Sequence, residues 1–243
     1  MSIEIFEVGG SLRDELIGVK NPPDRDFCAV IDGEAAWEEL RSWADASMDK
    51  VFQVKKEFLT IRGLIGKDAI DIVLCRQDGN YSDGRRPDNV RPSTLLNDLS
   101  RRDFTMNAMA RKVSTINLTP IGPVIDPFNG TKDIFNGQIK CVGNTQERIG
   151  EDNLRLLRAI RFAITKDLTL SNELKQLVGS MRWFVSLANS VSRERIQEEL
   201  SKMFKFDTVK SIQFLTQHCN PIALTMLFDE ANIWLKPTSE KRK

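Results

Sequence analysis

Two short segments near the N-terminus carry residues whose types and spacing suit metal-dependent chemistry. Gly9-Gly10-Ser11 follows an apolar, β-branched run and precedes a helical pattern, so this turn can present backbone N–H groups at a helix start to phosphates. Asp24 and Asp26 open the next apolar run, and side chains two residues apart share one face of a strand. Two carboxylates beside a phosphate cradle are what Mg²⁺-dependent phosphoryl or nucleotidyl transfer requires. The order and spacing predict a nucleotide-handling, polymerase-like active site.

Asp71 is a candidate third carboxylate. It lies in the run 69–74, which is otherwise apolar, and a charge in an apolar strand is costly unless it is paired or binds a metal. The competing interpretation is an edge-strand acid that faces water. A glycine turn and a D-x-D segment are each common alone, but their order on consecutive elements favours a joint site, and we favour Asp71 as part of it.

Residues 99–108 combine a basic pair, an acid and an amide before an apolar run in which we expect a helix. Asp103 and Asn107 are four residues apart and can hydrogen-bond a ribose while Arg102 contacts a phosphate. A capped helix start with a solvated arginine pair explains the same residues, and side-chain chemistry alone favours that simpler explanation.

A third segment, residues 151–162, places Asp152 and Arg155 three residues apart, with Arg158 and Arg161 following at the same interval. A carboxylate acceptor beside a forked donor can recognise the hydrogen-bonding edge of a base, and further arginines can neutralise a triphosphate. A helix that begins with acids and continues with cations also accounts for the pattern. Taken alone, that helix explanation is the stronger one.

Composition restricts the remaining chemistry. The 243 residues are 41% hydrophobic and 28% charged, as in a soluble globular protein, with no apolar stretch that could span a membrane and no secretory signal at the start. His218 is the only histidine, which excludes histidine-based triads and multi-histidine metal sites, so acid–base and metal chemistry must come from carboxylates. The four cysteines form no C-x-x-C pair and three lie in apolar runs, which predicts free thiols and a cytoplasmic location.

The elements that must position these residues change character along the chain. Apolar runs predict strands over 3–8, 26–31, 58–65, 69–74, 124–125 and 138–142, and helices over 11–17, 34–45, 93–101 and 104–112. A charged, glycine-containing loop at 78–92 is expected to be mobile. From residue 144 the pattern is helical, over 154–163, 168–181, 193–204 and 209–227. The expected class is α+β: a mixed sheet with flanking helices, followed by an all-helical arm.

Together and in this order, the segments resemble those of class II tRNA nucleotidyltransferases (CCA-adding enzymes) and bacterial poly(A) polymerases. The R-R-D-x-x-x-N-A and E-D-x-x-R-x-x-R patterns are the most specific, and they join segments at 8–14, 24–26, 125–130 and a neck-like motif at 193–200. The resemblance implies a polymerase-β-like nucleotidyltransferase head at 1–142, a nucleotide-selecting helical neck at 143–205 and a truncated helical body at 206–243.

The same resemblance implies template-independent addition of CMP and AMP, from CTP and ATP, to the 3′ end of tRNA at a two-metal Mg²⁺ site. It assigns Mg²⁺ binding to Asp24 and Asp26 and activation of the RNA 3′-hydroxyl to Asp71. It assigns nucleotide binding to Gly9, Gly10, Ser11, Arg13, Arg102, Asp103, Asn107, Asp152, Arg155, Arg158 and Arg161. Of these, Asp152 and Arg155 would select the base, and the loop 78–92 would help to switch from C to A addition.

Three departures from the family pattern are visible. Asp71 stands where many members have Glu, Asn153 stands where Pro is usual, and the chain ends about 40 residues after the neck-like motif. We therefore expect a minimal form that binds mainly the tRNA acceptor end, or that works as an oligomer or with a helper subunit. A G-R-R-F-like element of poly(A) polymerases is missing from residues 51–58, which favours a CCA- or A-adding enzyme. The alternatives are a poly(A) or oligo(A) polymerase and a catalytically weak RNA-binding fragment.

Overall fold

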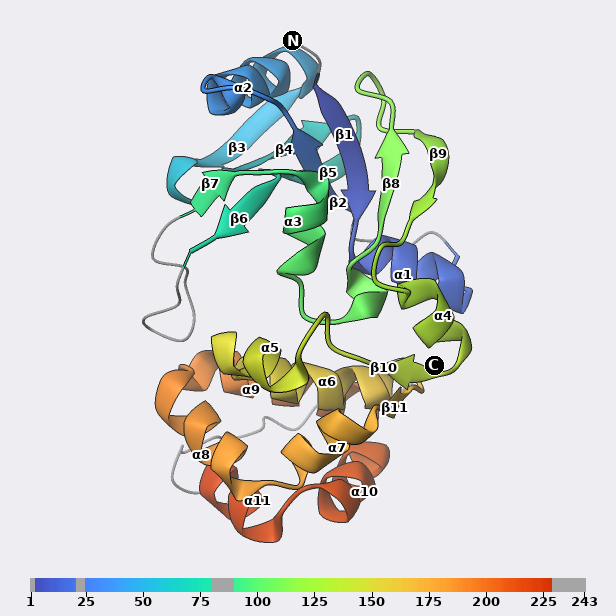
Figure 1. Cartoon of the computed structure of the whole chain (residues 1–243), viewed down its shortest axis with the longest axis vertical. Helices are drawn as coiled ribbons and strands as arrows, with labels where there is room; N and C mark the ends of the chain where they lie inside the picture. The colour runs from blue at the N-terminus through green and yellow to red at the C-terminus, as the bar shows by residue number, and fades with distance from the viewer. Residues whose placement is uncertain (1–2, 21–24, 80–89, 229–243) are drawn as a thin grey trace. The chain divides into compact units, whose positions relative to one another are not determined.

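The computed structural model describes residues 3–20, 25–79 and 90–228, and Figure 1 traces the chain. Asp24 and most of the loop 78–92 lie outside the described residues. Contacts between residues group the described chain into two compact units, the first ending at Phe135 and the second beginning at Asn136. The predicted head, neck and body boundaries at 142 and 205 stay predictions.

A seven-stranded mixed sheet forms the centre of the first unit (Figure 1). Its strands, in spatial order, are β3 (Lys50–Lys55), β4 (Thr60–Ile65), β5 (Asp68–Leu74), β2 (Asp26–Val30), β1 (Glu4–Val8), β8 (Ala110–Val113) and β9 (Pro120–Ile125). Among these strands β2 and β5 pair in parallel, and every other neighbouring pair is antiparallel. A separate antiparallel pair joins β6 (Arg76–Asp78) to β7 (Val90–Pro92).

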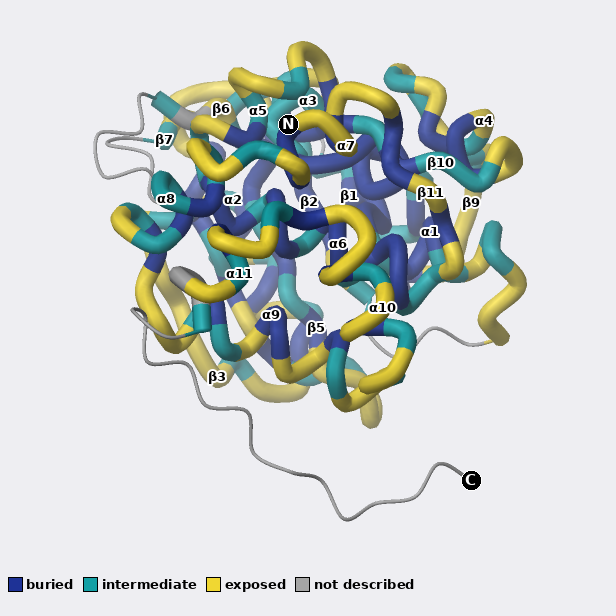
Figure 2. Tube along the Cα trace, turned by 90° about the horizontal axis from the view of Figure 1, so that it is seen from below, coloured by how far each residue is buried: buried dark blue, intermediate teal, exposed yellow. Residues whose placement is uncertain are grey.

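One face of this sheet packs against α2 (Ala36–Ser47). The helix presents Ala36, Leu40 and Ala44 at four-residue intervals, and all three are fully buried. They join alternate strand residues such as Phe27 and Ile72 in one hydrophobic core. Because side chains alternate along a strand, Asp26 and Asp71 leave the sheet on the opposite face. Edge strand β3 is exposed along most of its length (Figure 2).

The remaining helices of the first unit are short. They are α1 (Gly10–Ile17), the 3₁₀ turn η1 (Lys56–Phe58), α3 (Leu95–Ser100), the 3₁₀ turn η2 (Thr105–Asn107) and α4 (Gly130–Phe135).

The predicted helix over 104–112 is wrong. Only η2 is helical there, and the chain then extends as β8. Ala110 pairs with Val8 on one side and with Ile125 on the other, so the strand satisfies its backbone groups on both edges.

The second unit is mostly helical. Its helices are α5 (Thr145–Glu151), α6 (Leu154–Thr165), α7 (Asn172–Val178), α8 (Met181–Ser190), α9 (Arg193–Phe206), α10 (Thr208–His218) and α11 (Pro221–Phe228). The central helix α6 buries eight residues and packs mainly against α9. Strand β10 (Gln138–Ile139), within the predicted strand 138–142, pairs in parallel with β11 (Thr169–Leu170). The strand β11 therefore replaces the start of the predicted helix 168–181.

The predicted helix 209–227 is two helices. The side chain of Asn220 accepts hydrogen bonds from the backbone N–H groups of Ile222 and Ala223, and Pro221 occupies the first helical position, so a new helix starts there. Within the described residues, no helix is long and apolar enough to cross a bilayer.

Candidate active site

Asp26 and Asp71 lie side by side in the sheet. They are direct partners in the parallel register of β2 and β5, so their side chains leave the same face of adjacent strands, about 4.8 Å apart along the sheet. Val8 of β1 is the antiparallel partner of Asp26, which brings the end of β1, and therefore the glycine turn that follows it, next to the same point. The sequence predicts that Asp71 lies beside the D-x-D segment, and the structure places it beside Asp26, the described aspartate of that segment.

Asp71 also has a cationic neighbour. Nε of Arg62, its partner on β4, lies 3.0 Å from Oδ1 of Asp71, but the pair does not have hydrogen-bond geometry, and this buried oxygen accepts no hydrogen bond. A carboxylate oxygen without a hydrogen bond, next to the exposed carboxylate of Asp26, suits a hard cation or a hydroxyl group. The described residues contain no group of three or more His, Cys, Asp or Glu side chains that could hold a metal.

The glycine turn places an uncapped helix start beside these carboxylates. Gly9 has φ 81° and ψ −128° and precedes α1, whose first turn has no capping side chain and no acidic residue. The hydroxyl Oγ of Ser11 is buried in this turn without a hydrogen-bond partner. Free N–H groups, a helix dipole and an unpartnered hydroxyl together form an anion-binding arrangement.

Two guanidinium groups lie against this turn. A Cβ atom on Gly9 would lie 3.0 Å from Nη1 of Arg102, and one on Gly10 would lie 3.4 Å from Nη2 of Arg13. Glycine at position 9 therefore allows Arg102 to approach the backbone closely, whereas a Cβ at position 10 would make only an ordinary contact with Arg13. The positive charges of both arginines add to the anion-binding character of the helix start.

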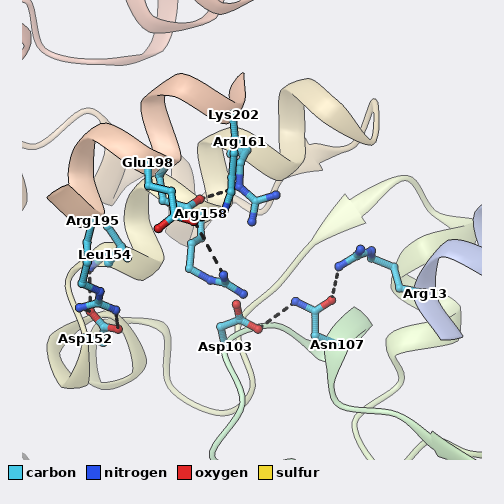
Figure 3. Close-up of polar contacts among 11 residues, drawn as sticks. Arg13, Asp103, Asn107, Asp152, Leu154, Arg158, Arg161, Arg195, Glu198 and Lys202 are labelled. Carbon is cyan, nitrogen blue, oxygen red and sulfur yellow. Dashed lines mark hydrogen bonds and ion pairs between the residues drawn. The ribbon is translucent and has the colours of Figure 1, made fainter. Parts of the chain in front are cut away.

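A chain of buried hydrogen bonds connects three of the predicted site residues (Figure 3). Nη1 of Arg13 donates to Oδ1 of Asn107 at 2.7 Å, and Nδ2 of Asn107 donates to Oδ1 of Asp103 at 2.9 Å. The same oxygen of Asp103 accepts the backbone N–H of Phe104 at 2.8 Å. The structure brings Asp103 and Asn107 together through a 3₁₀ turn rather than through the helix that the sequence predicts.

Arg102 is held by a residue that sequence reasoning missed. Asp98 of α3 is almost fully buried, and its carboxylate lies 2.7 Å from Nη2 of Arg101 and 3.1 Å from Nη2 of Arg102. Burial raises the pKa of Asp98, but the positive charges and hydrogen bonds of the two arginines outweigh burial and hold the pKa below its usual value. The spacing of Asp98 to the arginine pair, three and four residues, is the signal that could have identified it.

The second unit pairs each of the proposed base-selecting residues with another side chain, and Figure 3 shows the pair of Asp152 with Arg195. Nη2 of Arg195 donates to Oδ2 of Asp152 at 2.8 Å, and Oδ1 of Asp152 accepts the backbone N–H of Leu154. Nη1 of Arg155 donates to Oε2 of Glu151 at 2.6 Å and to the carbonyl oxygen of Arg148 at 2.8 Å. Arg195 and Glu151 were not predicted as site residues, although Arg195 belongs to the neck-like motif.

The two later arginines of α6 share one buried carboxylate. Nε of Arg161 donates to Oε2 of Glu199 on α9 at 2.5 Å, and Nη1 of Arg158 lies 4.0 Å from Oε1. Both guanidinium groups also lie over the ring of Phe162, at 4.1 Å for Arg161 and 5.5 Å for Arg158. Glu199 therefore fixes the positions of these arginines from the facing helix, and no pattern within the segment 151–162 could have revealed it.

Comparison with known proteins identifies relatives of this chain. Residues 5–140 match the model of the poly(A) polymerase head domain. The chain is 38% identical over 214 residues to the CCA-adding enzyme of Oceanobacillus iheyensis, covering 87% of this chain and 49% of that protein. It is 35% identical over 201 residues to the CCA-adding enzyme of Enterococcus faecalis, covering 82% and 45%. The chain thus spans about half the length of these relatives.

Solved structures show the same fold. The Bacillus stearothermophilus CCA-adding enzyme in complex with CTP superimposes with a TM-score of 0.74 at 26% identity, over 95% of this chain and 52% of that one. The Thermotoga maritima CCA-adding enzyme complexed with tRNA-CCA gives a TM-score of 0.69 at 29% identity, over 93% and 48%. Since the head-domain model covers more than half of its length, the chain belongs to the poly(A) polymerase head-domain family.

Proposed function

We propose that this chain adds CMP and AMP, from CTP and ATP, to the 3′ end of tRNA without a nucleic-acid template. The observation that carries the proposal is the in-register pair of Asp26 and Asp71 beside an uncapped glycine turn. The relatives named CCA-adding enzymes, one solved with CTP and one with tRNA, support the choice of substrates.

The carboxylates fit a Mg²⁺ site. Asp26 is exposed, and with Asp24 it would hold the metal, while Asp71 has a buried oxygen that accepts no hydrogen bond. Bound Mg²⁺ would neutralise the triphosphate and lower the pKa of the attacking hydroxyl. Asp71 would accept the proton of the RNA 3′-hydroxyl as its oxygen attacks the α-phosphorus, and the bond to the pyrophosphate group would break.

The remaining residues of the first unit would bind the nucleotide. The backbone N–H groups at the start of α1, the hydroxyl of Ser11 and the guanidinium groups of Arg13 and Arg102 would hold the triphosphate. Asn107 and Asp103, already connected by a hydrogen bond, would contact the ribose.

Base selection would belong to the second unit. Asp152 offers carboxylate oxygens and Arg155 offers forked N–H donors, a pair that complements the edge of cytosine or adenine. Arg195 and Glu151 hold these side chains in ion pairs, so they are oriented before a base arrives. Arg158 and Arg161, fixed by Glu199, would support the nucleotide. All four cysteines are buried free thiols, as expected for the cytoplasmic location that we also propose.

A nucleotide-panel assay tests the function. The purified chain is incubated with Mg²⁺, one labelled nucleoside triphosphate, and tRNA whose 3′ end stops short of the C, CC or CCA that is to be added. We expect addition of C and A that stops at CCA. Asp26→Asn should abolish incorporation, whereas Asp45→Asn on the exposed surface of α2 should leave it unchanged. Long ladders from ATP on any RNA would indicate a poly(A) polymerase instead. Tight tRNA binding without incorporation would refute catalysis.

A further inference from the structure

A buried carboxylate lies beneath the proposed metal site. Glu7 belongs to β1, and its side chain is 4% exposed. Nε of Arg25 donates to Oε1 of Glu7 at 2.9 Å, and Nη2 of Arg25 donates to Oε2 at 3.3 Å. Arg25 stands between Asp24 and Asp26 in the sequence, so the forked pair ties the D-x-D segment to the centre of the sheet.

The same carboxylate also connects to the helix of the glycine turn. Nη2 of Arg111, on β8, donates to Oε2 of Glu7 at 3.0 Å. The two terminal nitrogens of Arg111 also donate to the carboxylate of Glu15 on α1, at 2.8 and 2.9 Å. The buried carboxylate of Glu7 therefore pairs both with Arg25, which precedes β2, and with Arg111 of β8, which in turn binds Glu15 of α1.

Arg25 is fixed by further contacts. Its Nη2 donates to the carbonyl oxygen of Leu118 at 2.9 Å, and its Cζ lies 5.0 Å from the ring centroid of Phe27. Side chains alternate along an extended chain, so the side chain of Arg25 points to the face opposite that of Asp26. Without its carboxylate partner, this guanidinium could turn toward the neighbouring aspartates and compete with a cation for them.

We propose that Glu7 is a positioning residue that, through Arg25 and Arg111, sets the place of Asp26 relative to the start of α1. The proposal rests on the proposed function insofar as Asp26 is taken as a ligand of the metal site. Partners behind first ligands typically change metal affinity by about 10- to 100-fold when they are removed, and this sets the size of the expected effect.

Direct metal binding tests the proposal. The affinity of the full chain for Mn²⁺ is measured from free Mn²⁺ by electron paramagnetic resonance, without nucleotide or RNA. We expect Glu7→Gln to weaken Mn²⁺ binding about tenfold and to raise the Mg²⁺ concentration needed for half-maximal incorporation, with a smaller change in the rate at saturating Mg²⁺. The matched control is Glu4→Gln, which breaks the exposed ion pair with Lys112 between the same two strands and should leave binding within twofold. A folded Glu7→Gln protein with wild-type Mn²⁺ affinity would overturn the proposal.

Arg25→Gln separates positioning from simple electrostatics. Loss of a positive charge beside two aspartates should tighten cation binding by Coulomb attraction alone, whereas loss of positioning should weaken it. We expect weaker Mn²⁺ binding, and tighter binding would overturn the proposal. This variant keeps the Glu7–Arg111 pair, and the side chain of Arg25 that it replaces is 35% exposed. It therefore still tests the positioning role if Glu7→Gln does not fold.

Mn²⁺ binding tests the positioning role of Glu7, and nucleotide incorporation tests the proposed function, so the failure of one can be told from the failure of the other. If the wild type binds Mn²⁺ through Asp26, and Glu7→Gln weakens that binding, positioning holds even if no nucleotide is incorporated. If Asp26→Asn binds Mn²⁺ as the wild type does, the metal site is elsewhere and the positioning role falls with it.

Discussion

Glycine at position 9 allows an arginine side chain to lie against the backbone of the turn. Its φ of 81° with ψ of −128° belongs to a region that L-residues avoid, and a Cβ there would lie 3.0 Å from Nη1 of Arg102. Nearby, the hydroxyl of Ser11 is buried without a partner, which costs about 1–3 kcal/mol in a folded protein. The unpartnered hydroxyl reduces stability, which is expected if this turn serves to bind a ligand.

Gly9→Ala should therefore weaken nucleotide binding beyond its effect on stability. We expect a loss of about 1–3 kcal/mol in the free energy of unfolding from backbone strain, and a Kd for ATP and CTP raised at least about tenfold because Arg102 is displaced. Gly18→Ala is the matched control, since Gly18 ends the same helix at φ 94° with nothing within 4 Å of a Cβ. Denaturant unfolding and equilibrium dialysis measure the two quantities. Equal nucleotide affinity in both variants would contradict the role of the turn.

At the scale of elements, a buried apolar run that continues from one element into the next hides the boundary between them. Phe104, Met106 and Met109 precede β8 and are fully buried like its first residue, Ala110, so the run shows no periodicity that separates the 3₁₀ turn from the strand, and the pattern predicts one helix over both. The partners of β8, on β1 and β9, are distant in sequence or poorly marked. By contrast, β1, β2 and β5 were predicted well, because β-branched residues bounded by turns identify them locally.

The same distinction applies to the candidate site. Residue types and spacing identified the carboxylates, the glycine turn and the Asp103–Asn107 pair, since each of these is a local pattern. Asp26 and Asp71 are partners because β2 pairs in parallel with β5, although β3 and β4 lie between these two strands in the sequence. No local pattern specifies that pairing. The supporting partners Glu199 and Arg195 lie on α9, about 40 residues from the arginines and acid that they hold, and only tertiary packing reveals them.

Asp98 makes the stability of α3 and the following turn depend on pH. Its pKa is lowered from 3.8 in the folded chain, so its contribution is complete above pH 3.8 and disappears as the pH falls through the lower folded pKa. We expect Asp98→Asn to lose about 1.5–3 kcal/mol of unfolding free energy at pH 7, and this difference to shrink below pH 4.

The control for this pH dependence is Asp167→Asn. Asp167 also has a lowered pKa, from its hydrogen bond to Lys210, but its side chain is 91% exposed, so little stability should be lost at any pH. Denaturant unfolding from pH 3 to 7 measures both variants. A difference between the wild type and Asp98→Asn that stays constant across this range would show that the carboxylate is not an ionised partner of Arg101 and Arg102.

At the scale of the whole molecule, the residues of the candidate site are divided between two units. The first contains the sheet, the carboxylates and the glycine turn, with a core built around α2. The second contains the proposed base-selecting residues, Asp152 between α5 and α6 and Arg155 on α6, together with the side chains that hold them. Because β10 pairs with β11, residues 138–139 group with the second unit, and a cut after Phe135 leaves all three sheets of the described residues intact.

A fragment of residues 1–135 should bind triphosphates without choosing among bases. The anion-binding turn and the carboxylates lie within it, whereas Asp152 and Arg155 do not. We expect similar Kd values for CTP, ATP, UTP and GTP with the fragment, and preference for CTP and ATP with the full chain, measured by equilibrium dialysis with Mg²⁺. Cooperative unfolding establishes that the fragment is folded. The full-length double variant Asp152→Asn, Arg155→Gln should lose selectivity in the same way while it keeps triphosphate affinity. A folded fragment that still prefers CTP to UTP would place base selection in the first unit.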